Sequence, residues 1–373
     1  MCMDMVKTKR IQDIVRGSLI GGAIGDALGY PVEFSNYNEI VSRYGEQGIC
    51  RFDLEPYWLN KSEHTGKAIV SDDTQMTMFT VCGLLNAAKK GESLLDSIKD
   101  AYLEWLTTQN ENYTLKEVPK CWITKIPEMN VRRAPGNTCL TSLQGIANKH
   151  IPINNSKGCG GIMRIAPIPL YGAVYNRMSI TDVDQLAGNA AQITHHHPLG
   201  YIPAALMAHI IYRLAQDEEP SRSRFEAYIR EGVEQVKEFY AVSKTSLRTL
   251  EQLVDKALTL SVNDQSDVMN IEQNLGGGWV AEETLAIAIY CTHRYYDDFE
   301  KALIASVNHS GDSDSTGAVT GNIIGTITGY NAIPQFYKSN LEHHDVILKL
   351  SDDLCDIQNN TYIEYNTQKH YGK

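Results

Sequence analysis

The segment GSLIGGAIGDALG, residues 17–29, places a glycine at every fourth position, and GAVTGNIIGTITG, residues 317–329, repeats that spacing. Both segments are otherwise apolar enough for buried helices. Each glycine in a helix interior costs roughly 1 kcal/mol relative to alanine, so four on one helix face indicate a close approach of another backbone. Dense packing in the core explains such stripes, and so does direct contact between these two helices. Direct contact would bring Asp26 and Glu33 close to Asp312 and Asp314.

Two acidic clusters, Ser71-Asp72-Asp73 and Asp312-Ser313-Asp314-Ser315, stand where helices are predicted to begin. The first opens a helix to about Lys90 and the second a helix to about Tyr330. Serine and aspartate are common helix N-caps, and carboxylates there interact favourably with the helix macrodipole. A cap needs only one carboxylate, however, and carboxylate and hydroxyl oxygens together are ligands for a hard cation such as Mg²⁺. The spacing leaves both readings open, two caps or one split metal site.

Composition limits the partners of the chain. The net charge of −11 over 373 residues argues against non-specific binding to nucleic acid or to an anionic membrane. No apolar run is long enough to span a bilayer. The eight cysteines show no CxxC or zinc-like spacing, and no secretory segment precedes them. We therefore expect a reduced, cytoplasmic protein without nucleic-acid or membrane partners.

Helical periodicity dominates the chain and predicts an all-α fold. The predicted helices cover Ile11–Leu28, Thr74–Lys90, Leu94–Thr107, Asp182–Ile193, Pro198–Ala215, Arg224–Val242, Leu247–Leu260, Val280–Thr292, Phe299–Asn308, Gly317–Tyr330 and Leu341–Gln358. Loops rich in Gly, Pro and Asn are expected chiefly at Tyr30–Glu63, Thr108–Asn137, Ile151–Arg164 and Asn263–Gly278. We expect one compact domain over residues 1–373, with a core at about 11–358 and a polar C-terminal tail.

The loop SKGCGGIMR, residues 156–164, is rich in glycine and has a basic residue near each end. Such a loop can present backbone N–H groups to a phosphate. It lacks the GxxxxGK[ST] order of a P-loop and does not follow a strand as a dinucleotide fingerprint would. An ordinary tight loop is the alternative to a diphosphate cradle.

Three consecutive histidines, His195, His196 and His197, join two predicted helices. Consecutive side chains diverge, whereas zinc ligands are usually spaced or paired at i and i+4. A structural role or a ligand contact therefore fits better than metal binding. His197, directly before the helix-starting Pro198, is the first candidate for hydrogen bonding a ribose or phosphate oxygen, although the sequence does not decide among the three.

Further loop positions each have more than one explanation. Trp279, after three glycines, stacks on a base or anchors its helix. Arg132 and Arg133 meet phosphate or solvent, before a helix capped by Asn137 or Thr138. Glu33, after the first helix, is a gate, a general base or an ordinary surface residue.

Taken in order, five segments resemble the ADP-ribosylglycohydrolase family, which includes ADP-ribosylarginine hydrolases and the glycohydrolase that reactivates dinitrogenase reductase. The matching segments are GGAIGDALG at 21–29, SDDT at 71–74, GGIMRIAP at 160–167, THHHP at 194–198 and GDSDS at 311–315. They span roughly Gly17 to Gly329. The resemblance implies a single all-α domain with a binuclear metal site in a cleft.

The resemblance also implies the site residues. Two Mg²⁺ ions, or Mn²⁺, would be held from one helix start by Ser71, Asp72 and Asp73, and from the other by Asp312, Asp314 and Ser315, with Asp314 bridging. Glu33, Asp73 and Asp314 would be catalytic. Residues expected to contact ADP-ribose are Asn137, Gly158, Gly160, Gly161, Met163, Arg164, His197 and Trp279.

Two departures from the family pattern bear on these roles. Relatives commonly carry Thr where this chain has Ser71 and Ser315, and both residue types supply a hydroxyl oxygen. Some relatives carry an acidic residue where this chain has Ala134, shortly before Gly136 and Asn137. That change weakens any mechanism with a base from this loop and shifts the role towards Glu33 and the metal-binding aspartates.

By resemblance, the expected activity is metal-assisted attack of water at the anomeric carbon of ADP-ribose linked to a protein side chain, first of all arginine. The alternatives are serine-linked ADP-ribose, O-acetyl-ADP-ribose, or an immunity protein that binds ADP-ribose or an ADP-ribosylating toxin without turnover. The target protein, the linkage, the preference between Mg²⁺ and Mn²⁺ and the oligomeric state do not follow from the sequence.

Overall fold

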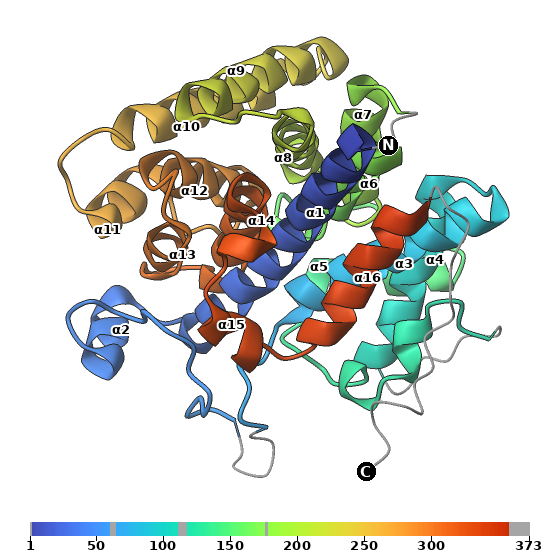
Figure 1. Cartoon of the computed structure of the whole chain (residues 1–373), viewed down its shortest axis with the longest axis horizontal. Coiled ribbons are helices and arrows are strands. Elements are labelled where there is room, and N and C mark those ends of the chain that lie inside the picture. Colours follow the sequence, from blue (N-terminus) through green and yellow to red (C-terminus); the bar gives the residue numbers. More distant parts are fainter. Residues whose placement is uncertain (1, 60–64, 111–117, 176–177, 358–373) are drawn as a thin grey trace.

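The computed structural model describes residues 2–59, 65–110, 118–175 and 178–357, with side chains from residue 9 onward. These residues form one compact helical domain around one hydrophobic core (Figure 1). Within the described ranges extended pairing is limited to two isolated bridges, Ala68 with Leu341 and Gly158 with Val280. The all-α prediction is confirmed. The predicted polar tail, from residue 358, lies outside the described residues.

The principal helices are α1 (Cys2–Gly29), α2 (Tyr37–Tyr44), α3 (Asp72–Lys90), α4 (Leu94–Gln109), α5 (Asn137–Ala147), α6 (Pro167–Tyr175), α7 (Ile180–Gln192), α8 (Pro198–Gln216), α9 (Arg222–Phe239), α10 (Lys244–Leu260), α11 (Asp267–Asn270), α12 (Ala281–Arg294), α13 (Phe299–Val307), α14 (Ser313–Ala332), α15 (Gln335–Asn340) and α16 (His344–Asp356). Short 3₁₀ turns lie at Tyr30–Val32, Trp122–Lys125, Pro127–Met129 and Cys159–Gly161, and a π-helical turn at Ile271–Leu275. In the part of the chain that the structure describes, no helix is long and apolar enough to cross a membrane.

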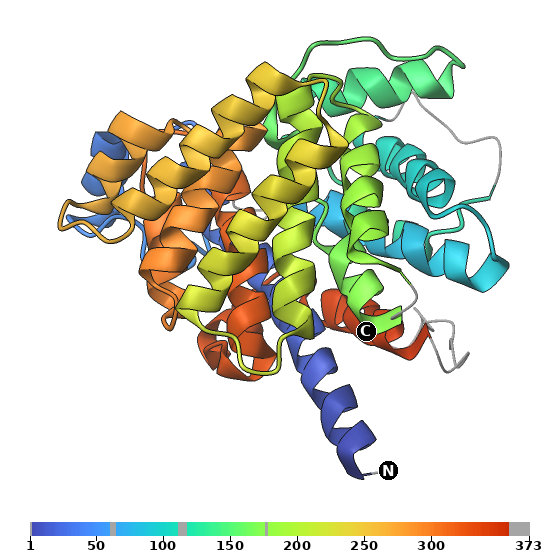
Figure 2. The same ribbon diagram turned by 90° about the horizontal axis from the view of Figure 1, so that it is seen from above.

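Helices α1 and α14 form an antiparallel pair at the centre of the domain, with α16 alongside α1 and with α12 and α13 packed against α14 (Figures 1 and 2). Their glycines face each other at very short range. A Cβ on Gly21 would lie 2.4 Å from the carbonyl oxygen of Gly321, and a Cβ on Gly321 would lie 2.0 Å from that of Gly21. Any larger residue would force the helices apart. The hypothesis that the two stripes contact each other directly is confirmed.

The antiparallel register of α1 and α14 places the end of one helix beside the start of the other. Gly25 faces Gly317 in the same reciprocal manner, and a Cβ on Gly29 would lie 2.1 Å from the carbonyl oxygen of Ser313. The C-terminal end of α1 therefore lies against the first turn of α14. This contact brings the residues after Gly29 next to the second acidic cluster.

The last glycine of the second stripe departs from the prediction. Gly329 has φ +75° and ψ 166°, so α14 is kinked there instead of continuing as a regular helix. A Cβ at Gly329 would lie 2.2 Å from a carboxylate oxygen of Asp13, which also accepts the N–H of Asn331 at 2.9 Å. Glycine is required here for its positive φ and for contact with a side chain of α1.

Several helices were not predicted. Helices α2, α6, α11 and α15 fall in segments expected to be loops or left unassigned. Helix α5 begins where a helix was expected, but its N-cap is Gly136 and not Asn137 or Thr138. Helix α6 begins Pro167-Ile168-Pro169, and prolines are tolerated in a first turn because its N–H groups lack helical partners. The predicted helix Leu341–Gln358 is α16, which begins later, after the left-handed His343 (φ 56°).

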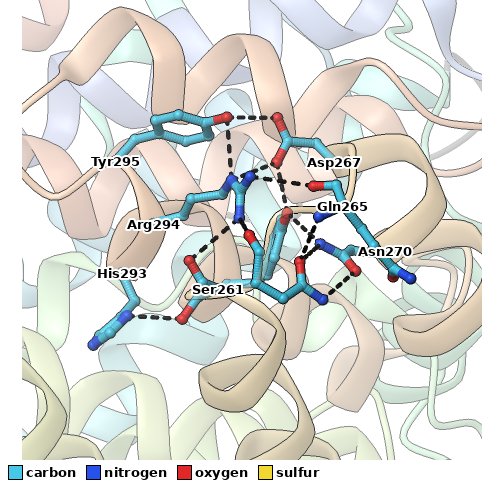
Figure 3. A network of polar contacts seen from close by, with 9 residues as sticks. Ser261, Gln265, Asp267, Asn270, His293, Arg294 and Tyr295 are labelled. Carbon is cyan, nitrogen blue, oxygen red and sulfur yellow. Dashed lines mark hydrogen bonds and ion pairs between the residues drawn. The ribbon is translucent and has the colours of Figure 1, made fainter.

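A polar network fixes the segment between α10 and α12 (Figure 3). Arg294, the last residue of α12, donates to the carbonyl oxygens of Asn263 at 2.8 Å and Gln265 at 3.2 Å. The carboxylate of Asp267 accepts the hydroxyls of Tyr290 at 2.6 Å and Tyr295 at 2.8 Å. These bonds hold α11 in place, and with it the approach to the loop that carries Trp279.

Candidate active site

The first turns of α3 and α14 converge beside the end of α1. Asp26, fully buried on α1, accepts the backbone N–H groups of Ser71 at 3.0 Å and Thr74 at 3.1 Å. It also accepts the Thr74 hydroxyl at 2.5 Å. A carboxylate from the glycine-rich helix therefore anchors the N-terminus of α3 and fixes the position of the first acidic cluster.

Capping accounts for only part of each cluster. The Ser71 hydroxyl accepts the N–H of Asp73 at 3.2 Å, and Asp312 accepts the N–H of Ser315 at 3.3 Å. Ser71 and Asp312 are thus the N-caps of α3 and α14. Asp314 accepts the same Ser315 N–H at 2.9 Å, so one N–H faces two carboxylates. Capping does not require both, nor Asp72 and Asp73 beside Ser71, so a second function must explain their burial.

A cavity of about 300 Å³ opens between the two helix starts. Its acidic wall comprises Glu33, Asp72, Asp73, Asp312 and Asp314, and no lysine or arginine is among its lining residues in the described part of the chain. Single carboxylate oxygens of Glu33, Asp312 and Asp314 lie within 4.8 Å of one another. The expectation that α1 would carry Glu33 to the second cluster is confirmed.

These carboxyl groups do not ionise independently. Burial raises the pKa values of Asp72, Asp73 and Asp312 well above the ordinary range, and the Asp314 carboxylate raises them further. Burial, followed by repulsion from Asp314 and Asp312, raises the pKa of Glu33 to about 11. The wall holds protons that a cation would replace.

The donor set suits a hard divalent cation. The Oδ2 atom of Asp73 is buried and has no hydrogen-bond partner among the described residues, although buried polar atoms are normally paired. The Ser315 hydroxyl adds a neutral oxygen to the cavity wall, while Ser71 is fully buried. Clustered carboxylate and hydroxyl oxygens are the ligands that Mg²⁺ and Mn²⁺ prefer.

The glycine-rich loop forms the opposite wall. Gly158, Cys159, Gly160 and Met163 line the cavity, and the Cys159 thiol donates to Oδ2 of Asp312 at 2.8 Å. Glycine is required at position 160, because a Cβ there would lie 2.9 Å from the Cys139 sulfur. Gly161 packs behind the wall, where a Cβ would lie 2.8 Å from the carbonyl oxygen of Gly200.

The prediction that Arg164 contacts ADP-ribose needs correction. Its side chain is fully buried, bonds the Thr194 hydroxyl at 2.6 Å and lies over the ring of Tyr102 at 4.2 Å. The guanidinium is thereby committed to the interior and is not part of the cavity lining. Arg164 supports the glycine-rich loop from the protein interior. A diphosphate in the cavity would therefore have to bind backbone N–H groups of that loop.

The structure also changes which histidine lines the cavity, from His197 to His195. Nδ1 of His197 accepts the N–H of Leu199 at 3.0 Å, so His197 caps α8 and is not on the cavity wall. His195 lines the cavity, buried against Gly158 and Gly160, and burial lowers its pKa to about 3. Nδ1 of His196 accepts the N–H of Asn154 at 3.3 Å. His195 is the neutral histidine of the site.

Asn137 and Trp279 lie where the sequence placed them, on the cavity wall, and Ala134 lies there too. Sequence reasoning missed Phe34, whose ring stacks on Trp279 with 5.1 Å between centroids. It also missed Cys159 as a partner of Asp312. The position of Phe34 directly after Glu33 was the available signal, whereas nothing in the cysteine spacing pointed to Cys159.

The helical fold, the paired helix starts and the acid-lined cavity define an all-α protein with a buried acidic cluster at a ligand-sized cavity. A family model, described as ADP-ribosylglycohydrolase, matches residues 7–363. The chain therefore belongs to the ADP-ribosylglycohydrolase family, whose members are hydrolases that act on ADP-ribosylated substrates.

Named relatives agree with this assignment. ADP-ribosylhydrolase ARH3 of Homo sapiens is 25% identical over 357 residues, which cover 88% of this chain and 89% of the relative. The ADP-ribosyl-[dinitrogen reductase] glycohydrolase of Rhodospirillum rubrum is 24% identical over 338 residues, covering 89% and 91%. A solved ADP-ribosylglycohydrolase-related protein complex shares the fold at a TM-score of 0.60 and 21% identity, over 94% of this chain and 99% of that one.

Proposed function

We propose that this protein releases ADP-ribose from arginine side chains of modified proteins, with two Mg²⁺ ions, or Mn²⁺, as cofactors. The observation that carries the proposal is the cavity wall of five carboxyl groups without a lysine or arginine among its described lining residues. Such a wall favours a substrate whose leaving group and transition state are both cationic.

The proposed cation ligands are Asp72, Asp73, Asp312, Asp314 and Ser315, with Ser71 behind them. Divalent cations bound there would hold ribose hydroxyls and activate water near the anomeric carbon. The unpaired Oδ2 of Asp73 supports this assignment, because a buried carboxylate oxygen without a donor is costly unless a ligand completes it.

The chain's own groups supply the rest of the chemistry. Cleavage of the N-glycosidic bond develops positive charge at the anomeric carbon, which neighbouring carboxylates stabilise. Glu33, with a carboxylate oxygen within 4.8 Å of those of Asp312 and Asp314 at the cavity wall, is the candidate to give a proton to the departing guanidine nitrogen. Water supplies the hydroxyl group that the anomeric carbon retains, and the second proton of that water restores the Glu33 carboxyl.

The remaining walls position ADP-ribose. Backbone N–H groups around Gly160 are the candidates for the diphosphate, since those of Gly158 and Cys159 donate to the Ser156 hydroxyl and the Trp279 carbonyl oxygen. Asn137 and His195 offer neutral hydrogen-bonding groups for ribose or phosphate oxygens. In this proposal His195 takes the role that was expected of His197.

The test is release of ADP-ribose from an arginine-modified protein by the wild type and Asp314→Asn, with and without Mg²⁺. The proposal expects turnover in the wild type with Mg²⁺ and none in Asp314→Asn. Asp345→Asn is the matched control, because that side chain is 86% exposed and far from the cavity lining. Full activity in Asp314→Asn contradicts the assignment.

The same assay on serine-linked ADP-ribose and on O-acetyl-ADP-ribose decides the linkage. Preference for either of these substrates over the arginine-linked protein contradicts the arginine proposal but keeps the site. A binding protein, including one directed at an ADP-ribosylating toxin, would bind free ADP-ribose and release none from any substrate.

A further inference from the structure

Two aromatic side chains stand unusually exposed at the rim of the cavity. Phe34 is 71% exposed and Trp279 is 41% exposed, yet their rings stack with 5.1 Å between centroids and 26° between planes. Both line the cavity beside Glu33 and Asp312. Aromatic rings usually gain stability by burial, so a stacked pair left open to solvent at a binding cavity indicates a surface for a flat ligand group.

The chain holds both rings rigidly in this exposed position. The carboxylate of Glu283 accepts the N–H groups of Gly277 at 3.1 Å and Gly278 at 3.2 Å. The carbonyl oxygen of Gly277 accepts the N–H of Asp312 at 2.8 Å. The loop that ends in Trp279 is therefore tied to a proposed cation ligand, and the indole is positioned before any ligand arrives.

Phe34 is held at a backbone cost. Its φ of +64° lies in the left-handed region, which is unfavourable for a residue with a bulky side chain. The N–H of Ser35 donates to the carbonyl oxygen of Val32 at 3.0 Å, and the N–H of Tyr37 to the Ser310 hydroxyl at 2.8 Å. These bonds fix the turn on both sides of Phe34. A strained conformation retained at a cavity rim points to function.

The ring surface could receive an adenine base or a guanidinium group, and the surroundings favour the guanidinium. Planar guanidinium groups stack on aromatic faces and gain from cation–π attraction, most strongly on tryptophan. The rings adjoin the Glu33 carboxyl, whose oxygens can accept the N–H groups of a guanidinium. The leaving group is also bonded directly to the anomeric carbon, whereas adenine lies at the other end of ADP-ribose.

We infer that Phe34 and Trp279 form the subsite for the leaving group and select a guanidinium. This inference rests on the proposed function and adds the determinant of linkage specificity. The stacked rings contact the flat face of the guanidinium, while Glu33 faces its nitrogen. A serine hydroxyl or an acetate has no such cationic plane and gains little from the rings.

The experiment compares two substrates that share ADP-ribose, namely ADP-ribosylated agmatine and O-acetyl-ADP-ribose. In Trp279→Ala, kcat/KM for ADP-ribosylated agmatine should fall roughly tenfold, mainly through KM, with the acetyl ester within about twofold of wild type. Trp279→Phe should restore most of the loss. Trp58→Ala, another tryptophan with 38% exposure but outside the cavity lining, should change neither.

Binding of free ADP-ribose, measured by calorimetry, should be the same in wild type and Trp279→Ala. A parallel loss on both substrates, or a loss of ADP-ribose affinity, overturns the inference and assigns the rings to the base.

A second experiment distinguishes failure of this inference from failure of the proposed function. If the wild type releases no agmatine, saturation-transfer NMR of agmatine added to protein saturated with ADP-ribose still tests the subsite. Weaker agmatine binding in Trp279→Ala than in wild type supports the inference. Equal binding, or none in the wild type, overturns it.

Discussion

Asp73 and Asp267 both lie in the first turn of a helix, but the chain provides for their carboxylates in opposite ways. Asp267 accepts two tyrosine hydroxyls and pairs with Arg294 at 3.1 Å (Figure 3). Asp73 is more deeply buried, faces other carboxyl groups and leaves its Oδ2 without a described partner. Asp184, Glu282 and Asp353 also have one buried unpaired oxygen, but each pairs through its other oxygen with a basic side chain. No such basic partner of Asp73 is found among the described residues, which favours a ligand-binding role for this acid.

The difference between Asp73 and Asp267 also affects the stability of the folded protein. Burying a carboxylate without a partner costs several kcal/mol, and the site concentrates five carboxyl groups around one cavity. The close contact of α1 with α14 and the bonds from Asp26 to the start of α3 supply the rigidity that keeps these groups together. Stability elsewhere in the fold offsets a site that is unfavourable until its ligands bind.

The largest expected effect is on catalysis. Asp73→Asn should reduce ADP-ribose release at least about a hundredfold, because it removes a cation ligand and charge that stabilises the transition state. Asp267→Asn should keep the activity of each folded molecule close to wild type. Initial rates of ADP-ribose release, normalised to the amount of folded protein, test both variants. Equal losses of activity would contradict the different roles of Asp73 and Asp267.

Stability should respond in the reverse order. Asp267→Asn should lower the free energy of unfolding by about 1–3 kcal/mol, because an amide leaves Arg294 without its anionic partner. Asp73→Asn should leave the metal-free protein as stable as wild type or more stable, since it removes like-charge repulsion. Urea denaturation in EDTA measures both values. Destabilisation by Asp73→Asn comparable to that of Asp267→Asn would contradict a ligand-directed role.

The change in Tm on addition of metal should distinguish the roles of Asp73 and Asp267. At an Mg²⁺ concentration about a hundred times Kd, binding to the folded state adds about 2.7 kcal/mol and raises Tm by several degrees. The shift should persist in Asp267→Asn and vanish in Asp73→Asn. An identical shift in both variants would place the bound ion somewhere other than the cavity.

The smallest expected effect is on the pH dependence of metal binding. The raised pKa values of Asp72, Asp73 and Asp312 mean that the metal-free site holds protons that a cation must displace. Mn²⁺ affinity should therefore weaken as pH falls, by up to about tenfold per pH unit for each proton released. Calorimetric titration at several pH values measures this slope, and a constant affinity between about pH 6 and 8 argues against displaced protons.

Much of this arrangement could be predicted from the sequence, because it depends on backbone spacing. The four-residue glycine intervals indicated a close backbone approach, with direct contact between the two helices as one of two explanations, and that contact brings Glu33 to the second acidic cluster. Serine and aspartate at helix starts correctly predicted both the caps of α3 and α14 and the position of the carboxylates.

Side-chain direction could not be predicted in the same way. Arg164 and His197 stand in the expected segments, but one side chain turns into the core and the other caps α8. The stacked rings of Phe34 and Trp279 come from segments far apart in sequence, and only the folded chain brings them together. Spacing along one helix carries no information on such contacts.

The central claim is that the buried carboxylates of this cavity hold divalent cations for cleavage of an ADP-ribosyl bond. The most direct measurement is release of ADP-ribose from an arginine-modified protein by EDTA-treated enzyme, before and after Mg²⁺ or Mn²⁺ is restored. The account predicts no release without the ion, recovery with it, and no recovery in Asp73→Asn. Undiminished release in EDTA would contradict it.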